Sequence, residues 1–299
     1  MTYALLSRSV VFTALGLVPR LFGSNEWIFF TLTVGTNALG SLVGFLLYPL
    51  LGRKLYLLSC LGGLGSMPFL PYSIPIAVFS VSLLNPLLTP LGVEKHFTKE
   101  LYFAFSSGFL LSSLFVYLKL IFPVILVSSI LVLLIKGPMV RRTSLREIIL
   151  TFPSRKVIWL MASNFAVYGA FAVIVNRDTS LYVALFYVAV SISRILTRRL
   201  NLSLPLGLGL LAVGTVAFMV TGFQPLTFLL GLLYGPLHPI MADEAGKMGD
   251  PLVTVNYVFV TDVPAGFLVP YLLQFGVLVP GSVVVGMLLL TFLTGIRRT

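Results

Sequence analysis

The segment Leu226–Ile240, LTFLLGLLYGPLHPI, contains no Asp, Glu, Lys or Arg, and the segment Leu120–Ile135, LIFPVILVSSILVLLI, has the same character. Both are apolar on every side, whereas a strand of a membrane barrel alternates apolar and polar residues. A bilayer offers no water to the peptide groups, so a spanning segment bonds its own backbone as a helix or closes into a barrel. These two segments therefore predict membrane-spanning helices and an all-α integral membrane fold.

The composition of the whole chain agrees with this prediction. Hydrophobic residues make up 58% of the 299 residues and charged residues 10%, against about 25% charged in a soluble domain. The mean hydropathy is +1.04. So few polar side chains cannot cover a globular protein of this size, and we expect membrane lipid around the chain.

The net charge of +11 does not indicate a nucleic-acid partner. The basic residues lie in short clusters between apolar segments, which is the pattern of the positive-inside rule. The single cysteine, Cys60, excludes an intrachain disulfide. No Cys/His cluster occurs in the sequence, so we expect neither a metal nor a cofactor.

Polar turns divide the chain into about a dozen segments of the roughly 20 residues that a membrane-crossing helix needs. Before the polar segment Lys136–Lys156 they are Thr2–Leu21, Trp27–Leu51, two within Leu55–Val93 divided at Pro71-Tyr72-Ser73, and two within residues 99–136 divided near Lys119. After it they are Val157–Val175, Leu181–Leu196, Leu202–Thr221, Pro225–Ala242, Leu252–Leu273 and Val277–Ile296. The predicted domains are a six-helix bundle in residues 1–136, a cytoplasmic loop in residues 137–156, and a second six-helix bundle in residues 157–299.

The distribution of Lys and Arg supports this division independently. With a cytoplasmic N-terminus, seventeen of the twenty fall on the cytoplasmic side, and only Arg20, Lys119 and Arg177 fall on the other. The bias predicts cytoplasmic N- and C-termini in the plasma membrane. A cleaved signal peptide is disfavoured, because Arg8 and Arg20 flank the first apolar run and no small-residue cleavage site follows it.

Two basic turns recur at corresponding places in the two halves. The second segment ends at Gly52-Arg53-Lys54, and the eighth is followed by Arg198-Arg199. Together with the six-plus-six division and the central basic loop, these turns resemble those of the major facilitator superfamily. That family carries a Gly-x3-Asp-x2-Gly-Arg-Arg/Lys signature between its second and third helices, with an echo between the eighth and ninth.

The resemblance implies twelve helices in two parallel six-helix bundles, related by a pseudo-two-fold axis along the membrane normal. It implies a secondary active transporter that moves a small solute by alternating access. The first, fourth, seventh and tenth helices would line a central cavity, and we expect a monomer.

The resemblance also implies a cytoplasmic gate, in which the basic turn docks against the start of the eleventh helix. Arg53 or Lys54 would then pair with Asp250, at a helix N-terminus that itself favours an anion. Arg194, near the corresponding turn of the second half, is assigned to the same gate. The alternative is that Arg53 and Lys54 only set the topology at a helix end.

Asp262 is the one acid that we expect at membrane depth. A rise of 1.5 Å per residue from Leu252 places it about 15 Å into the eleventh helix, near the midplane. A carboxylate there costs a few kcal/mol, so we predict a protonatable coupling group or a partner for a cationic substrate. The alternative is a fixed ion pair with Arg8 or Arg194.

His238 and Arg8 are further candidates in the membrane segments. His238, between Pro236 and Pro239, either relays protons or bonds a carbonyl that is freed where the two prolines break the tenth helix. Arg8 lies about one turn into the first helix. It either binds an anionic group in the cavity or extends to the membrane surface as an anchor.

Polar side chains on the expected cavity helices are the candidate substrate contacts, and interhelical hydrogen bonding is the alternative for each of them. They are Asn85 and Thr89 on the fourth helix, Asn164 and Tyr168 on the seventh, Tyr234 on the tenth and Asn256 on the eleventh. Asn37 on the second helix belongs to the same class. Because the expected cavity has few fixed charges, we expect a neutral, weakly polar or amphipathic solute.

The residue patterns of membrane enzymes and channels do not occur in the sequence. It contains no Asp-x2-Asp or Asp-x3-Asp to hold magnesium and a diphosphate, no Gly-x-Ser-x-Gly, and no ring or filter of like residues. Two other interpretations remain, a ten-helix drug/metabolite-type transporter and a non-transporting membrane scaffold. The six-plus-six division argues against the first, and Asp262 argues against the second.

Overall fold

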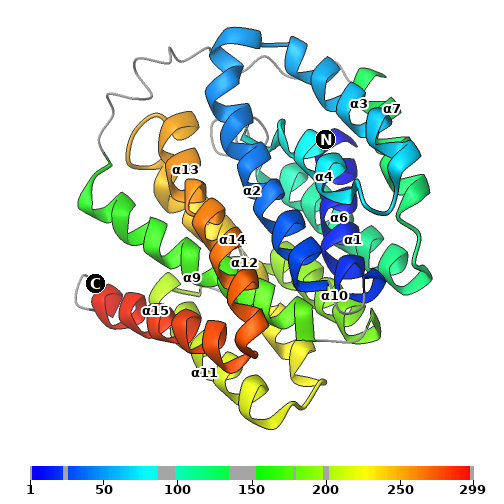
Figure 1. Cartoon of the computed structure of the whole chain (residues 1–299). Helices are drawn as coiled ribbons and strands as arrows, with labels where there is room; N and C mark the ends of the chain where they lie inside the picture. The colour runs from blue at the N-terminus through cyan, green and yellow to red at the C-terminus, as the bar shows by residue number, and fades with distance from the viewer. Residues whose placement is uncertain are drawn as a thin grey trace.

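The computed structural model of the chain describes residues 2–22, 26–86, 98–134, 153–177, 180–197 and 202–296, with the side chains of residues 2–8, 98–105 and 131–134 outside the description. Within these ranges every regular element is a helix and no strand occurs (Figure 1). The all-α prediction is confirmed for this part of the chain.

The helices of the described residues fall into two parts of the chain. In the first part of the chain they are α1 (Thr2–Leu21), α2 (Glu26–Leu51), α3 (Lys54–Ser66), the 3₁₀ helix η2 (Met67–Phe69), α4 (Ile74–Ser82), α6 (Thr98–Leu118) and α7 (Phe122–Leu134). In the second part they are α9 (Arg155–Arg177), α10 (Ser180–Leu196), α11 (Leu204–Thr221), α12 (Leu226–Gly246), α13 (Pro251–Val260), α14 (Asp262–Leu272), η3 (Leu273–Phe275) and α15 (Leu278–Ile296).

Five helical segments are long and apolar enough to cross a bilayer. They are Glu26–Leu51, Arg155–Arg177, Leu204–Thr221, Pro251–Phe275 and Leu278–Ile296, and the shorter helices Ser9–Leu21, Ser106–Leu118 and Ser180–Leu196 are also apolar. Large apolar side chains such as Val220 and Leu50 face outward, where lipid would surround them. The chain is therefore a multi-pass membrane protein.

Many helix boundaries agree with the sequence-based segments. α1 has the expected bounds, the chain turns at residues 70–73 between η2 and α4, and Lys119 separates α6 from α7. Gly52, just after α2, has a φ of +51°, in the left-handed region that glycine adopts without steric cost. This glycine allows the basic turn to reverse the chain immediately before α3.

Two segments differ from the sequence-based expectation. The eleventh segment is divided at one residue, because α13 ends at Val260 and α14 begins at Asp262, although Thr261 between them keeps helical dihedral angles (φ −68°, ψ −11°) and Pro251–Phe275 continues as one span. The tenth segment is not broken, because α12 runs through both Pro236 and Pro239. A proline inside a helix leaves one backbone carbonyl without its usual N–H partner, and a side chain from another helix fills that role in α12, as described below.

The helices of residues 2–134, here called the first half, pack in the same pairs as those of residues 155–296, the second half. In the first half α2 packs on α4, α3 packs on α4 and α7, and α1 packs on α6. In the second half α10 packs on α12, α11 packs on α12 and α15, and α9 packs on α14. Each pair of the first half therefore has a counterpart in the second: α2–α4 corresponds to α10–α12, α3–α4 to α11–α12, α3–α7 to α11–α15, and α1–α6 to α9–α14.

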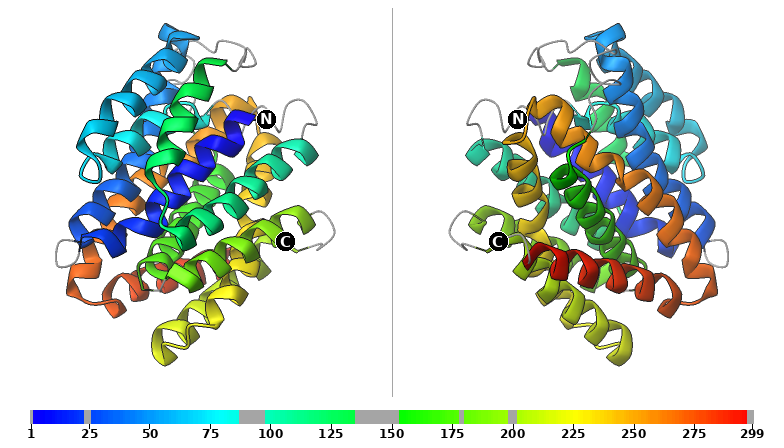
Figure 2. Two further views of the ribbon diagram at one scale, coloured as in Figure 1. Left: turned by 90° about the vertical axis from the view of Figure 1, so that its right-hand side faces the viewer. Right: turned by 90° about the vertical axis from the view of Figure 1, so that its left-hand side faces the viewer.

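The halves meet chiefly along two helix pairs, α2 with α14 and α6 with α10, with smaller contacts of α2 with α13 and of α1 with α9 and α10. The blue α2 and the orange α14 lie side by side in Figure 1 and in the right-hand view of Figure 2. Residues 9–19 of α1 and 166–175 of α9 are buried. The core of the molecule therefore runs through α1 and α9, between the two halves.

Glycines permit the closest contacts inside each half. A Cβ on Gly44 of α2 would overlap the backbone of Leu83, in the turn that follows α4. On α12, a Cβ on Gly231 would lie 2.6 Å from the Phe186 carbonyl oxygen of α10, and one on Gly235 would lie 2.7 Å from that of Val190. Small residues let membrane helices come into backbone contact. Glycine on α2 therefore allows the close approach to α4 and the turn after it in the first half, and glycine on α12 allows the corresponding approach to α10 in the second.

Candidate functional site

Asp262 lies directly after the interruption between α13 and α14. Pro264 has no N–H to donate to the carbonyl of Val260, and its ring is tolerated in the first turn of α14. Asp262 lies eleven residues after Pro251, a rise of about 16 Å in a helix. Its side chain is half-buried, so a carboxylate stands well inside an apolar helical segment.

Asn164 of α9 forms hydrogen bonds with the residues around this interruption. Its Nδ2 donates to Oδ1 of Asp262 at 2.6 Å, and it lies 3.1 Å from Oγ1 of Thr261 and 3.3 Å from the carbonyl oxygen of Val258. Asn164 is fully buried. The sequence predicts Asn164 as a substrate contact or an interhelical bond, and the structure brings it together with Asp262.

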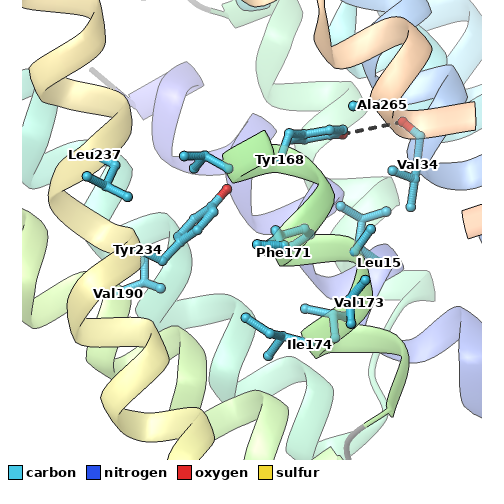
Figure 3. Packing of buried hydrophobic residues seen from close by; sticks show 14 of the residues in the cluster. Leu15, Val34, Tyr168, Phe171, Val173, Ile174, Val190, Tyr234, Leu237 and Ala265 are labelled. Atoms are coloured by element: carbon cyan, nitrogen blue, oxygen red, sulfur yellow. Dashed lines mark hydrogen bonds between the residues drawn. The ribbon is translucent and has the colours of Figure 1, made fainter. Parts of the chain in front are cut away.

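A second polar chain begins one turn further along α9. The Tyr168 hydroxyl accepts from Nδ2 of Asn37 at 2.8 Å and donates to the carbonyl of Val34 at 3.4 Å, both on α2 (Figure 3). Oδ1 of Asn37 in turn accepts from Oγ of Ser82 at 2.9 Å. These bonds join α9 of the second half to α2 and α4 of the first.

His238 and Tyr234 belong to an aromatic cluster. The His238 ring lies 5.0 Å from Tyr234 and stacks at 5.7 Å on Phe259 of α13, measured between ring centroids. Tyr234 is buried and extends from α12 toward α9, where its ring lies 5.5 Å from Phe171 (Figure 3). The ring contacts given for these two candidates are thus with other aromatic side chains.

Arg194 lies inside the helix bundle. Pro239 leaves the Gly235 carbonyl without its helical partner, and Nε of Arg194 donates to that oxygen at 3.3 Å. The guanidinium also lies 5.0 Å from the ring centroid of Phe109 on α6, within cation–π range. The structure thus places Arg194 between α10, α12 and α6 rather than in the basic turn, and it is Arg194 that meets the carbonyl freed by Pro239.

The remaining cavity candidates make bonds between segments. Nδ2 of Asn85 donates to Oγ of Ser41 on α2 at 3.1 Å. Nδ2 of Asn256 donates to the carbonyl of Pro86 at 3.2 Å, across the two halves. These are the interhelical bonds that the sequence offers as the alternative to substrate contact. Thr89 and the side chain of Arg8 lie outside the described residues.

The three gate candidates from the basic turn and the start of the eleventh segment lie at helix ends. Oδ1 of Asp250 accepts the N–H of Leu252 at 2.9 Å, so Asp250 caps α13, with Pro251 at the first helical position. Arg53 and Lys54 are exposed at the start of α3. A gating pair between Asp250 and this turn stays a prediction.

The ion pairs described in the structure gather at the end of α12. Lys247 lies 2.7 Å from Asp243 and 3.7 Å from Glu244, and Lys156 of α9 lies 3.3 Å from Glu244. The hydrogen bond to Asp243 raises the pKa of Lys247. Among the described residues, no three His, Cys, Asp or Glu side chains gather around one point to hold a metal.

Sequence reasoning missed three residues that join elements. Thr261 donates from Oγ1 to the carbonyl of Met161 at 2.9 Å, and Ser82 bonds Asn37. Arg20, near the end of α1, donates to its own Gly16 carbonyl at 2.5 Å and to the Val175 carbonyl of α9 at 3.2 Å. The position of Thr261, directly before Asp262 and three residues before Pro264, is a signal that could have been read. Nothing in the sequence indicates the partners of Ser82 or Arg20.

Arg177 stands at the end of α9 as Arg20 does at the end of α1. Its Nη1 donates to the carbonyls of Phe218 at 3.2 Å and Met219 at 2.8 Å, and the guanidinium lies 5.4 Å from the Phe218 ring. Both acceptors belong to α11, so Arg177 bonds within its own half. Arg20, in contrast, reaches the other half.

The sequence matches no family model and no curated protein, but the fold matches solved structures over nearly its whole length. A D-xylose–proton symporter superposes with a TM-score of 0.64 at 15% identity, covering 97% of this chain and 95% of that one. The human organic anion transporter MFSD10 gives 0.63 at 17%, covering 98% and 97%. The E. coli fucose:proton symporter gives 0.57 at 14%, covering 99% and 98%.

The fucose transporter FucP in its outward conformation, which is described as a major facilitator superfamily transporter, also matches, with a TM-score of 0.58 at 14% identity. At such low identity these structures show the fold of this chain alone and transfer no residue assignment to it. The resemblance that the basic turns and the segment count indicate in the sequence is therefore confirmed at the level of the fold.

Proposed function

We propose that this protein is a secondary active transporter that moves a small solute by alternating access between its two halves. The observation that carries the proposal is Asp262, a carboxylate at a helix interruption next to the contact between the halves. A Cβ on Gly266, one turn after Asp262, would lie 3.0 Å from the Val34 carbonyl of α2. Any separation of α2 from α14 would thus change the surroundings of Asp262.

The proposal includes twelve spans arranged as two parallel six-helix bundles. The corresponding helix pairs of the two halves support it, because a duplicated parallel unit repeats its internal pairs. The two contacts between the halves also correspond. Under such a duplication α2 corresponds to α10 and α6 corresponds to α14, so the pair α2–α14 corresponds to the pair α10–α6. Inverted five-helix halves, as in drug/metabolite-type transporters, would give a different pairing.

The orientation of the proposal has a cytoplasmic N-terminus, and cysteine labelling tests it. Tyr72 and Gln274 are exposed near the ends of η2 and α14, and Arg155 is exposed at the start of α9. In a chain with the buried Cys60 replaced by alanine, we expect Tyr72→Cys and Gln274→Cys to react with an impermeant thiol reagent on intact cells. Arg155→Cys should react only after lysis. Reaction of all three from outside would contradict the twelve-span arrangement.

Asp262 is the proposed coupling group, and its removal should uncouple transport from an ion gradient. We expect gradient-driven accumulation in proteoliposomes to fall by about tenfold or more in Asp262→Asn, because the amide cannot take up and release a cation or proton. The solutes to screen first are neutral sugars, including D-xylose and fucose, for which two structural neighbours are named, and neutral amphipathic compounds.

The matched control for this experiment is Asp243→Asn, the same change at an exposed carboxylate that bonds Lys247. It should leave accumulation unchanged. Full gradient dependence in Asp262→Asn would contradict the coupling role.

The proposed solute is neutral and weakly polar or amphipathic. Among the described side chains, aromatic rings dominate the region between α1, α9, α10 and α12, with Phe12, Phe171, Tyr187 and Tyr234 in mutual contact through Phe171. These rings are buried in this structure, and in the proposed cycle they would meet a solute only where the halves part, as an aromatic surface that favours apolar or ring-shaped partners over strongly charged ones.

A further inference from the structure

The Tyr168 hydroxyl of α9 joins the second half of the molecule to α2 of the first. It accepts from Nδ2 of Asn37 at 2.8 Å and donates to the Val34 carbonyl at 3.4 Å (Figure 3). Other bonds between the halves end on a backbone carbonyl, such as the 2.8 Å bond from the Tyr187 hydroxyl to Phe12. A carbonyl inside a helix keeps its own N–H partner when such a side chain leaves. Parting α9 from α2, in contrast, removes the acceptor of the Asn37 amide.

The Asn37 side chain is held in place from within its own half. Its Oδ1 accepts from Oγ of Ser82, at the end of α4, at 2.9 Å. Asn37 is buried, and a buried amide donor that loses its acceptor costs more free energy than one that reaches water. Because Ser82 holds the oxygen of the amide, its Nδ2 is the atom that faces α9. The first half thus presents a fixed, directed donor to Tyr168.

Tyr168 lies where α9 becomes buried on every side. Residues 166–175 are all buried, whereas Phe165 is half-buried. Asn164, which bonds Asp262 at 2.6 Å, lies four residues before Tyr168 and therefore one turn away on the same face of the helix. Along α9, the bond from Tyr168 to α2 therefore stands between the polar site at Asp262 and the buried end of the helix.

We propose that the bond between the Tyr168 hydroxyl and the Asn37 amide is a latch, which holds α9 against α2 in this structure and breaks when the two halves part. The inference rests on the transport function proposed above. The latch separates the polar site at Asp262 from the end of the molecule where α1 and α9 finish. A salt bridge at this depth would leave a buried charge on breaking, whereas this uncharged pair can open and close repeatedly. Tyr168 is thus a positioning residue that sets the distance between α9 and α2.

A cysteine at Val175 measures how often this end of the molecule opens. Val175 is fully buried and lies seven residues after Tyr168, two turns further along the same face of α9. Cysteine is smaller than valine and fits the same space. In the purified full-length protein with Cys60 replaced by alanine, a water-soluble maleimide should react slowly with Val175→Cys. We expect Tyr168→Phe, which removes only the hydroxyl, to raise that rate by about tenfold, because the closed state then leaves the Asn37 amide without this acceptor.

The partner variant Asn37→Leu tests whether the two side chains act through one bond. It should also raise the rate at Val175→Cys, by less than Tyr168→Phe does, because the Tyr168 hydroxyl still donates to Val34. Either single change leaves one polar group without its partner. The double variant should therefore raise the rate by less than the product of the two single effects. Effects that multiply would show that the two residues act independently and would overturn the latch.

Two controls distinguish parting of the halves from local unfolding. Val190→Cys on α10 places the same cysteine at a fully buried position whose backbone lies against Gly235 of α12, inside the second half. Its reaction rate should be the same with and without Tyr168→Phe. Tyr72→Phe, the same change at an exposed tyrosine, should leave both rates unchanged. Size-exclusion profiles identify a variant that does not fold, and if Tyr168→Phe is such a variant, Asn37→Leu carries the test.

The outcomes separate the latch from the transport function. An equal rise at Val175→Cys and Val190→Cys, or no rise at either, overturns the latch. If the rate at Val175→Cys is unchanged while solute accumulation still depends on Asp262, the latch is overturned and the proposed function stands. If the rise is confined to Val175→Cys but the protein accumulates no solute, the latch stands and the transport function fails.

Discussion

Replacing Gly44 with alanine is expected to prevent most of the chain from folding. The new Cβ would overlap the carbonyl of Leu83 and lie 2.6 Å from the carbon of that carbonyl. These are backbone atoms that cannot rotate away, so α2 and the segment after α4 must separate. Overpacking costs about 1–3 kcal/mol where side chains can adjust, and a backbone clash exceeds that range. The yield of monodisperse protein and its unfolding midpoint measure the effect.

The control is Gly65→Ala on α3, in the same half. A Cβ there would meet no atom within 4 Å, and replacing glycine by alanine in a helix is favourable by roughly 0.5–1 kcal/mol. Gly65→Ala should therefore fold as well as the unaltered chain or slightly better. A stable, monodisperse Gly44→Ala protein would contradict the backbone contact between α2 and the Leu83 turn.

Replacing Gly266 with leucine is expected to give a folded protein that no longer transports. Gly266 lies against Val34 and Gly35, at distances of 3.0–3.3 Å from the new Cβ. This contact joins the two halves, which separate during the proposed cycle. The strain can therefore be released by parting α2 from α14 without unfolding either half. Solute accumulation should fall about tenfold or more, the signature of a missing conformational step.

Cross-linking between α2 and α14 measures the separation of the two halves and needs no solute. The rings of Trp27 on α2 and Tyr271 on α14 lie 6.0 Å apart, so cysteines at these positions should be joined by a bifunctional thiol reagent whose spacer replaces the two rings, in the Cys60→Ala background. Gly266→Leu should remove that cross-link. The control Gly286→Leu, at a position where a Cβ meets no atom within 4 Å, should keep it. Efficient cross-linking in Gly266→Leu would show that the halves still close.

The sequence predicts helix ends well, because bilayer thickness and the charges between segments act over about 20 residues at a time. The turn at residues 70–73 and the division at Lys119 follow from this scale alone. The interruption at Thr261 does not, because Pro264 frees a carbonyl without determining whether the helix bends, kinks or restarts. Pro236 and Pro239 were expected to break α12, but Arg194 of a neighbouring helix compensates Pro239.

The candidate site is harder to predict because its partners are far apart in the chain. Asn164 and Asp262 are each recognisable as polar residues in apolar segments. Their contact depends on the rotation of α9 about its axis and on its crossing with α13 and α14, which the apolar pattern does not encode when a helix is apolar all round. The same reason explains why Asn37 and Tyr168 pair across the halves, although the sequence offers them only as separate candidates.

Arg20 and Arg177 occupy corresponding places in the two halves but bond different partners. Each ends the first helix of its half, yet Arg20 bonds the opposite half at Val175, whereas Arg177 bonds Phe218 and Met219 of its own half. Two symmetric copies would carry two such arginine bonds between the halves, and both bonds would have to break together. Of these two arginines only Arg20 bonds across the halves, so in the proposed cycle the end of the molecule where α1 and α9 finish would open by releasing the guanidinium of Arg20 from Val175.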